Sequence, residues 1–103
     1  MATSASLAAQ LDREWTDPLV LQAQLNYWRS RRATDNPGLA NLAIDSGLAQ
    51  AGRALALDKD DADALEARGN LNYWRWLYPL ESDPAKRDQL IASAQADLER
   101  AKE

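Results

Sequence analysis

The amino-acid sequence predicts an all-α fold in which about five helices form antiparallel pairs, and three observations favour it. The pentapeptide Leu-Asn-Tyr-Trp-Arg that begins at Leu25 returns unchanged at Leu71, 46 residues later. Asp17, Asn36 and Asp83 each precede a proline, which is typical of the start of a helix. No segment shows the strict two-residue alternation of apolar and polar side chains that a half-buried strand requires. The repeat indicates that one helical unit occurs twice, with similar surroundings for the two pentapeptides.

The length and composition fit one small domain of ordinary globular character. The chain has 103 residues, 46% of them hydrophobic and 27% charged, and is too short for two independent cores. Its net charge of −4 argues against nucleic acid as a partner, because such binding draws on clustered positive charge. No apolar run approaches the ~20 residues that span a bilayer, and no signal peptide is visible. We therefore expect a cytoplasmic protein that binds neither nucleic acid nor membrane.

Capping residues set the expected limits of each helix. A carboxylate or amide before the first turn accepts a hydrogen bond from a backbone N–H that has no partner within the helix. Proline fits the first helical position because its missing N–H would be unpaired there anyway. The predicted helices cover residues 4–15, 18–32, 37–57, 62–78 and 84–102. They form a single domain, 1–103, with an N-terminal helix or cap (1–15), a first repeat (16–57) and a second repeat (61–103).

The fourth predicted helix carries apolar residues on two faces. A surface helix of a simple bundle needs only one apolar stripe. A helix with two stripes is expected to lie between neighbours, as it does where helix pairs stack. The first stripe holds Leu65, Gly69, Tyr73 and Leu77, and the second holds Ala67, Leu71, Trp74 and Tyr78.

The spacing of large, small and aromatic residues resembles a tetratricopeptide repeat (TPR). The first helix of that unit would carry Leu65, Gly69 and Tyr73, with Leu19, Ala23 and Tyr27 in the first copy. The second helix would carry Ala94, Leu98 and Ala101, with Gly47, Ala51 and Ala54 in the first copy. The resemblance implies a short right-handed α-solenoid. The standard unit has 34 residues, so this chain is similar to elongated repeats attached to bacterial serine/threonine kinases and other regulators.

The resemblance also implies a function, because the inner face of a TPR stack binds extended peptides. The chain is then a protein–protein interaction scaffold that binds a protein or peptide, and it is a monomer in isolation and a piece of a longer array. Asp17, Val20, Asp63 and Glu66 occupy that face in place of basic residues, so a basic or neutral peptide is favoured over an acidic one. The predicted partner-binding residues are Gln24, Tyr27, Glu66, Asn70, Tyr73 and Trp74.

Several alternatives stay open at this point. The repeats could be a structural spacer or regulatory region of a larger bacterial signalling protein, and Asn72 and Trp74 could serve packing alone. An enzyme is not expected, because the chain has no His and no Cys. No cofactor is implied. The acidic run from Asp58 to Asp63 lacks the ligand spacing of a calcium loop, so it is predicted to be an inter-helix turn with an N-cap. Trp76, Leu77 and Tyr78 are expected to pack against Leu80, Leu90 and Ile91 and not to form an exposed docking patch.

Overall fold

The computed structural model describes residues 3–33, 35–77 and 81–102, apart from the side chains of residues 3–16. Within this part of the chain there are four α-helices and no strand. The all-α prediction is confirmed, and the predicted number of five helices is wrong. The helices are α1 (Thr3–Arg32), α2 (Pro37–Leu57), α3 (Ala62–Leu77) and α4 (Pro84–Ala101).

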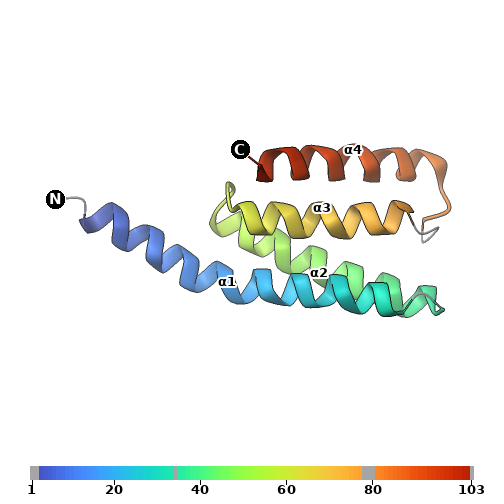
Figure 1. Cartoon of the computed structure of the whole chain (residues 1–103), viewed down its shortest axis with the longest axis horizontal. Helices are drawn as coiled ribbons and strands as arrows, with labels where there is room; N and C mark the ends of the chain where they lie inside the picture. Colours follow the sequence, from blue (N-terminus) through green and yellow to red (C-terminus); the bar gives the residue numbers. More distant parts are fainter. Residues whose placement is uncertain (1–2, 34, 78–80, 103) are drawn as a thin grey trace.

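The predicted and observed numbers of helices differ because of Asp17 and Pro18. The sequence predicted a break between two helices there, whereas α1 continues through both residues. A proline inside a helix has no N–H to donate and crowds the carbonyl four residues earlier, which costs about 3 kcal/mol and bends the helix. In Figure 1 the first turns of α1, drawn in blue, run at an angle to the rest of the helix. The neighbouring Leu, Gln, Ala and Glu residues are strong helix formers, so they favour helix on both sides of the proline. The segments predicted as 4–15 and 18–32 are therefore one bent helix.

The other predicted helix starts agree with the capping geometry. Asn36 Oδ1 accepts a hydrogen bond from the Leu39 backbone N–H at 3.2 Å, and Asp83 Oδ1 accepts one from Ala85 at 3.0 Å. Asp61 Oδ1 accepts one from Ala64 at 3.1 Å, which caps α3. The acidic run therefore forms a turn with an N-cap, as its sequence predicted. The predicted end of α3 at Tyr78 lies outside the described residues.

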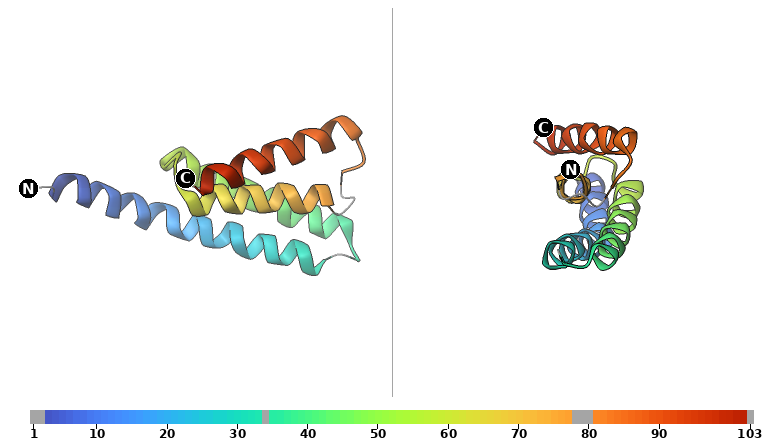
Figure 2. Two further views of the ribbon diagram at one scale, coloured as in Figure 1. Left: turned by 45° about the horizontal axis from the view of Figure 1, so that its top comes forward. Right: turned by 90° about the vertical axis from the view of Figure 1, so that its right-hand side faces the viewer.

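The helices pack as two antiparallel pairs, α1 with α2 and α3 with α4 (Figure 1). In the described part of the chain, α3 contacts all three other helices, whereas α4 contacts α3 alone. The N-terminal turns of α1 project beyond the ends of the other helices (Figures 1 and 2). The central position of α3 is the one that its two apolar stripes predicted. None of the described helices combines the length and apolar character that crossing a bilayer requires.

The core between these helices is built mainly from small side chains. A Cβ atom added at Gly47 would lie 2.8 Å from Leu71 Cδ1, and one added at Gly69 would lie 2.8 Å from Leu98 Cγ. Real Cβ atoms do not approach so closely, so a side chain at either position would force the neighbouring leucine to shift. The small residues therefore let the backbones approach, as the sequence pattern predicted. The buried apolar residues are Val20, Ala23, Ala40, Ile44, Ala51, Ala54, Ala64, Leu65, Ala67, Leu71 and Ala94.

The two predicted stripes of α3 are buried over part of their length. Leu65, Gly69, Ala67 and Leu71 are buried, whereas Tyr73 and Leu77 are exposed. The prediction that Leu77 packs inside the second pair is therefore wrong, because Leu77 is the last residue of α3 and half of its surface is open to solvent. Trp76 is half-buried, and its ring lies 5.7 Å from that of Tyr73. Tyr78 and Leu80 lie outside the described residues.

Polar contacts differ between the two pairs. In the first pair, Asn26 is buried and donates to Gln50 Oε1 at 2.8 Å. In the second, Arg68 donates two hydrogen bonds to the buried carboxylate of Asp97, at 2.7 and 2.8 Å. These hydrogen bonds raise the pKa of the Arg68 guanidinium above its usual value, against a smaller opposing effect of burial. A neutral pair thus joins α1 to α2, and an ion pair joins α3 to α4.

A second arginine joins the two pairs to each other. Arg75 on α3 donates to Asp45 Oδ1 at 2.6 Å and to Asn41 Oδ1 at 3.2 Å, both on α2. The Arg75 side chain is largely buried, whereas that of Asp45 is mostly exposed to solvent. The contact therefore ties α3 to α2 at a partly hydrated site, where it contributes less than a fully buried ion pair.

Candidate functional site

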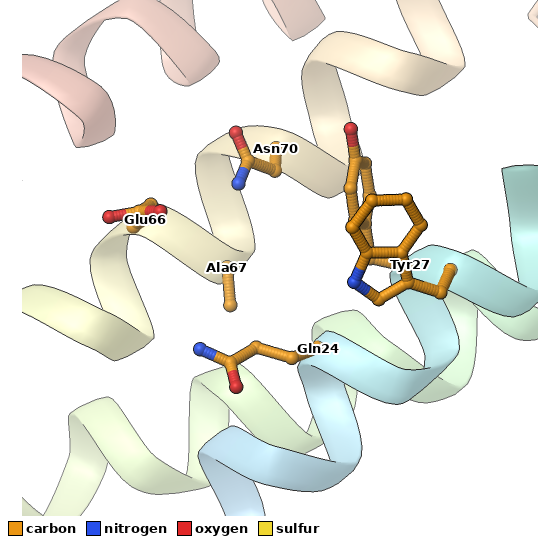
Figure 3. A pocket seen from close by; sticks show the side chains of 6 residues that line it. Gln24, Tyr27, Glu66, Ala67 and Asn70 are labelled. Atoms are coloured by element: carbon orange, nitrogen blue, oxygen red, sulfur yellow. The ribbon is translucent and has the colours of Figure 1, made fainter.

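A hollow of about 190 Å³ lies between α1 and α3 (Figure 3). Each helix supplies three residues that lie within about one helical turn of each other. Their side chains therefore share the face that lies toward the other helix. The hollow is smaller than the 300–1,000 Å³ typical of small-molecule sites, and it has the size of one or two amino-acid side chains. Its lining consists of Gln24, Tyr27 and Trp28 from α1 and of Glu66, Ala67 and Asn70 from α3.

Each lining residue has a distinct chemical role. Figure 3 shows the Gln24 amide and the Ala67 methyl group directed into the same space from opposite helices, with the Asn70 amide above them. An amide side chain both donates and accepts hydrogen bonds. Glu66 lies at the end of the hollow away from Tyr27, where its carboxylate can only accept hydrogen bonds. The hollow therefore combines two amides, one acid and an aromatic wall.

The aromatic wall continues into a cluster around Arg31. The Arg31 guanidinium carbon lies 5.7 Å from the centroid of the Tyr27 ring, 5.1 Å from Trp28 and 5.0 Å from Trp74. Tyr27 and Trp28 also meet edge to face, with centroids 5.6 Å apart. All three arginine distances fall within the ~6 Å reach of a cation–π interaction. Arg31 thereby connects rings from α1 and α3 at one end of the hollow.

Four of the six residues predicted to bind a partner meet at this hollow, namely Gln24, Tyr27, Glu66 and Asn70. The other two, Tyr73 and Trp74, do not line it. Tyr73 is exposed one turn further along α3, beside Trp76. Trp74 is half-buried beneath Arg31, between α3 and α1.

Two further residues near the predicted binding face belong to the core of the structure. Val20 was placed on the binding face, but it is buried in a cluster with Ala54 and Ala64. Asn26 is buried and bonded to Gln50, so it serves packing. Ala67 and the close approach of Arg31 to three rings were missed. Ala67 belongs to a predicted core stripe, and nothing in the sequence showed that its methyl group also borders the hollow. The spacing of Arg31 four residues after Tyr27 is a signal that could have indicated their contact.

The fold is that of a small all-α domain with paired antiparallel helices. Comparison of the chain with models of protein families, with curated proteins and with solved structures returned no match. The described residues also contain no group of three or more acidic, His or Cys side chains placed to hold a metal ion. The function of the domain is therefore inferred from the chemistry of the hollow.

Proposed function

We propose that this domain is a TPR-like interaction scaffold that binds an extended segment of a partner protein in the hollow between α1 and α3. The observation that carries the proposal is the convergence of Gln24, Tyr27, Glu66 and Asn70 on one hollow. The resemblance to a TPR predicts the same four residues from their positions on the first helix of each repeat.

The lining suits a peptide better than a small molecule or a reaction. A peptide backbone offers an N–H and a carbonyl at each residue, and the amides of Gln24 and Asn70 can pair with both. The space above Ala67 admits one side chain, and the rings of Tyr27 and Trp28 supply apolar contact for it. The lining has no nucleophile paired with a base, and the whole chain has no His or Cys, so the proposal is for a binding domain and not for an enzyme.

The charges around the hollow indicate the kind of peptide. Glu66 lines it, and Asp63, also exposed, lies one turn before on α3. No basic residue belongs to the lining, and the nearby Arg31 is engaged by three aromatic rings. A Lys or Arg of the partner would gain attraction from Glu66, whereas an acidic residue would face a like charge. We therefore propose a basic or neutral peptide as the partner segment.

The proposal is tested with two fluorescein-labelled peptides of the same length, one rich in Lys and Ala and the other rich in Glu and Ala. Fluorescence anisotropy should show binding of the Lys-rich peptide, weakened about tenfold or more by Gln24→Ala with Asn70→Ala, because each lost hydrogen bond contributes about 0.5–1.5 kcal/mol. Gln95→Ala, at an exposed position on α4, is the matched control and should leave binding unchanged.

Two results would contradict the proposal: preference for the Glu-rich peptide, or equal binding by the double variant and the wild type. Binding of neither peptide would also contradict the proposal. It would favour the alternative that the repeats only space other parts of a larger protein.

A further inference from the structure

The internal duplication gives each residue of α1 from Asp17 to Arg31 a counterpart on α3. One face of the two helices is covered differently. On α3 this face carries Leu71, which has no exposed surface, and the buried Ala67. Their counterparts on α1 are Leu25 and Leu21, which are 47% and 56% exposed. Trp28 on the same face is 53% exposed, whereas its counterpart Trp74 is half-buried. The same face is thus part of the core on α3 and open on α1.

The helix that covers this face on α3 is α2, and its chemistry can be described residue by residue. Gly47 lies directly against the Leu71 side chain, where a Cβ atom would be too close. Ala51, one turn later, packs in one cluster with Ala67. Asp45, two residues before Gly47, accepts the hydrogen bond from Arg75. The cover is therefore a helix with two small residues four positions apart and a carboxylate beside them.

The open face of α1 carries the features that such a helix would match. Leu25 stands where α3 has Leu71, and the exposed Arg29 stands where α3 has Arg75. A shallow hollow on this face is lined by Leu25, Trp28, Arg29 and Arg32. Two of these four residues are cations, so a helix that brings a carboxylate has complementary charge. Leu21 is larger than its counterpart Ala67, so the covering helix needs a small residue opposite it.

We propose that this face of α1, defined by Leu21, Leu25, Trp28 and Arg29, is a second docking surface, and that its occupant is an α-helix of a partner protein with the chemistry of α2. The partner helix presents Gly or Ala at two positions four residues apart and an Asp or Glu two residues before the first of them. The surface shares Trp28 with the hollow between α1 and α3. Leu21, Leu25 and Arg29 do not line that hollow, so each proposal can be tested without the other.

The test uses a fluorescein-labelled peptide with the sequence Pro37–Leu57, which carries the required pattern. The whole chain should bind it saturably in a fluorescence anisotropy titration. Leu25→Asp and Arg29→Glu in the chain should each weaken binding by at least about tenfold, as should Gly47→Leu in the peptide. Leu42→Asp in the chain is the matched control, because Leu42 is a leucine 63% exposed on α2, outside this face, and its loss should leave binding unchanged.

A disulfide trap distinguishes this surface from exchange of the peptide with the chain's own α2. The chain has no Cys, so Leu21→Cys in the chain and Ala51→Cys in the peptide introduce the only thiols. By analogy with the contact between Ala67 and Ala51, these two should form a disulfide when oxidised glutathione is added as the oxidant. The proposal is overturned if the peptide does not bind, if Leu25→Asp binds as well as the wild type, or if binding occurs without the cross-link. It is also overturned if sedimentation shows that Leu25→Asp breaks up a dimer of the chain, since the occupant would then be a second copy.

Discussion

The two copies of Leu-Asn-Tyr-Trp-Arg have one sequence and two kinds of surroundings. Both asparagines lie toward the partner helix of their own pair, but Asn26 is buried and bonded to Gln50 of α2, whereas Asn72 is half-buried and lines a hollow with residues of α4. On the opposite face they differ, because α2 covers Leu71 and no described element covers Leu25. The expectation of similar surroundings is therefore wrong for the face that carries Leu25 and Leu71, and on the other face the two copies share only the direction in which the asparagines lie. The comparison teaches that the position of the helix among its packed neighbours, and not local sequence, decides whether this leucine belongs to the core.

The largest difference in the free energy of unfolding is expected between alanine substitutions of Leu71 and Leu25. Leu71→Ala should lower the free energy of unfolding by about 2–5 kcal/mol, because it removes a fully buried side chain and leaves a cavity. Leu25→Ala should cost less than about 1 kcal/mol, because much of that side chain already contacts water. Urea denaturation followed by circular dichroism measures both. Equal losses would show that the two copies are covered to the same extent.

A second comparison concerns the sizes of the two side chains that meet at one contact within each helix pair. The first pair places Ala23 against Ala51, and the second places Gly69 against Leu98. Gly69→Ala should destabilise the domain by about 1–3 kcal/mol, because its Cβ would lie 2.8 Å from Leu98 Cγ and 3.2 Å from the Ala94 carbonyl oxygen. Leu98→Ala in the same molecule should recover part of this loss, because it recreates the first pair's combination.

The matched control for this experiment is Gly52→Ala. A Cβ atom at Gly52 would have no neighbour within 4 Å, so the change should stabilise α2 by about 0.5–1 kcal/mol through helix propensity alone. Thermal unfolding of these three variants and of Leu98→Ala alone provides the measurement. A stabilising Gly69→Ala, or strictly additive losses in the double variant, would refute the steric explanation.

The smallest difference in the free energy of unfolding is expected between substitutions that remove the polar contact within each helix pair. Asp97→Ala should cost about 1–3 kcal/mol, because two charge-assisted hydrogen bonds from Arg68 are lost. The loss stays below that of a fully buried ion pair, because the Arg68 side chain is 35% exposed and can regain water. Gln50→Ala should cost about 0.5–1.5 kcal/mol, because it removes one neutral bond to Asn26. A larger effect at Gln50 would reverse this order.

Much of the fold could be predicted because its signals are local. Asn36 and Asp83 mark helix starts through hydrogen bonds to residues two or three positions away, so the sequence alone contains the interaction. Pro18 misled the same reasoning, because an Asp-Pro sequence caps a helix or lies within one depending on the neighbouring segments. There the helix formers on both sides favoured one continuous α1.

The candidate site was predictable in part for the same reason. Gln24, Tyr27, Glu66 and Asn70 were predicted from the resemblance to a TPR, which assigns binding residues by their positions on the first helix of each repeat. Val20 was misplaced because its burial depends on Ala54 and Ala64, which belong to other helices. The contact of Arg31 with Trp74 likewise joins α1 to α3, and no spacing within one helix can show it.

The sequence by itself determined that the chain is helical, that one unit occurs twice, where three of the four helices begin, and which positions had to be small. These properties follow from interactions within a few residues and from a repeat that can be read directly. The tertiary structure decided which copy of each repeated residue is covered, that α1 runs through Pro18, and which side chains meet between α1 and α3. Such outcomes depend on the distances between helices far apart in sequence, because burial is a property of the packed neighbours and not of the residue.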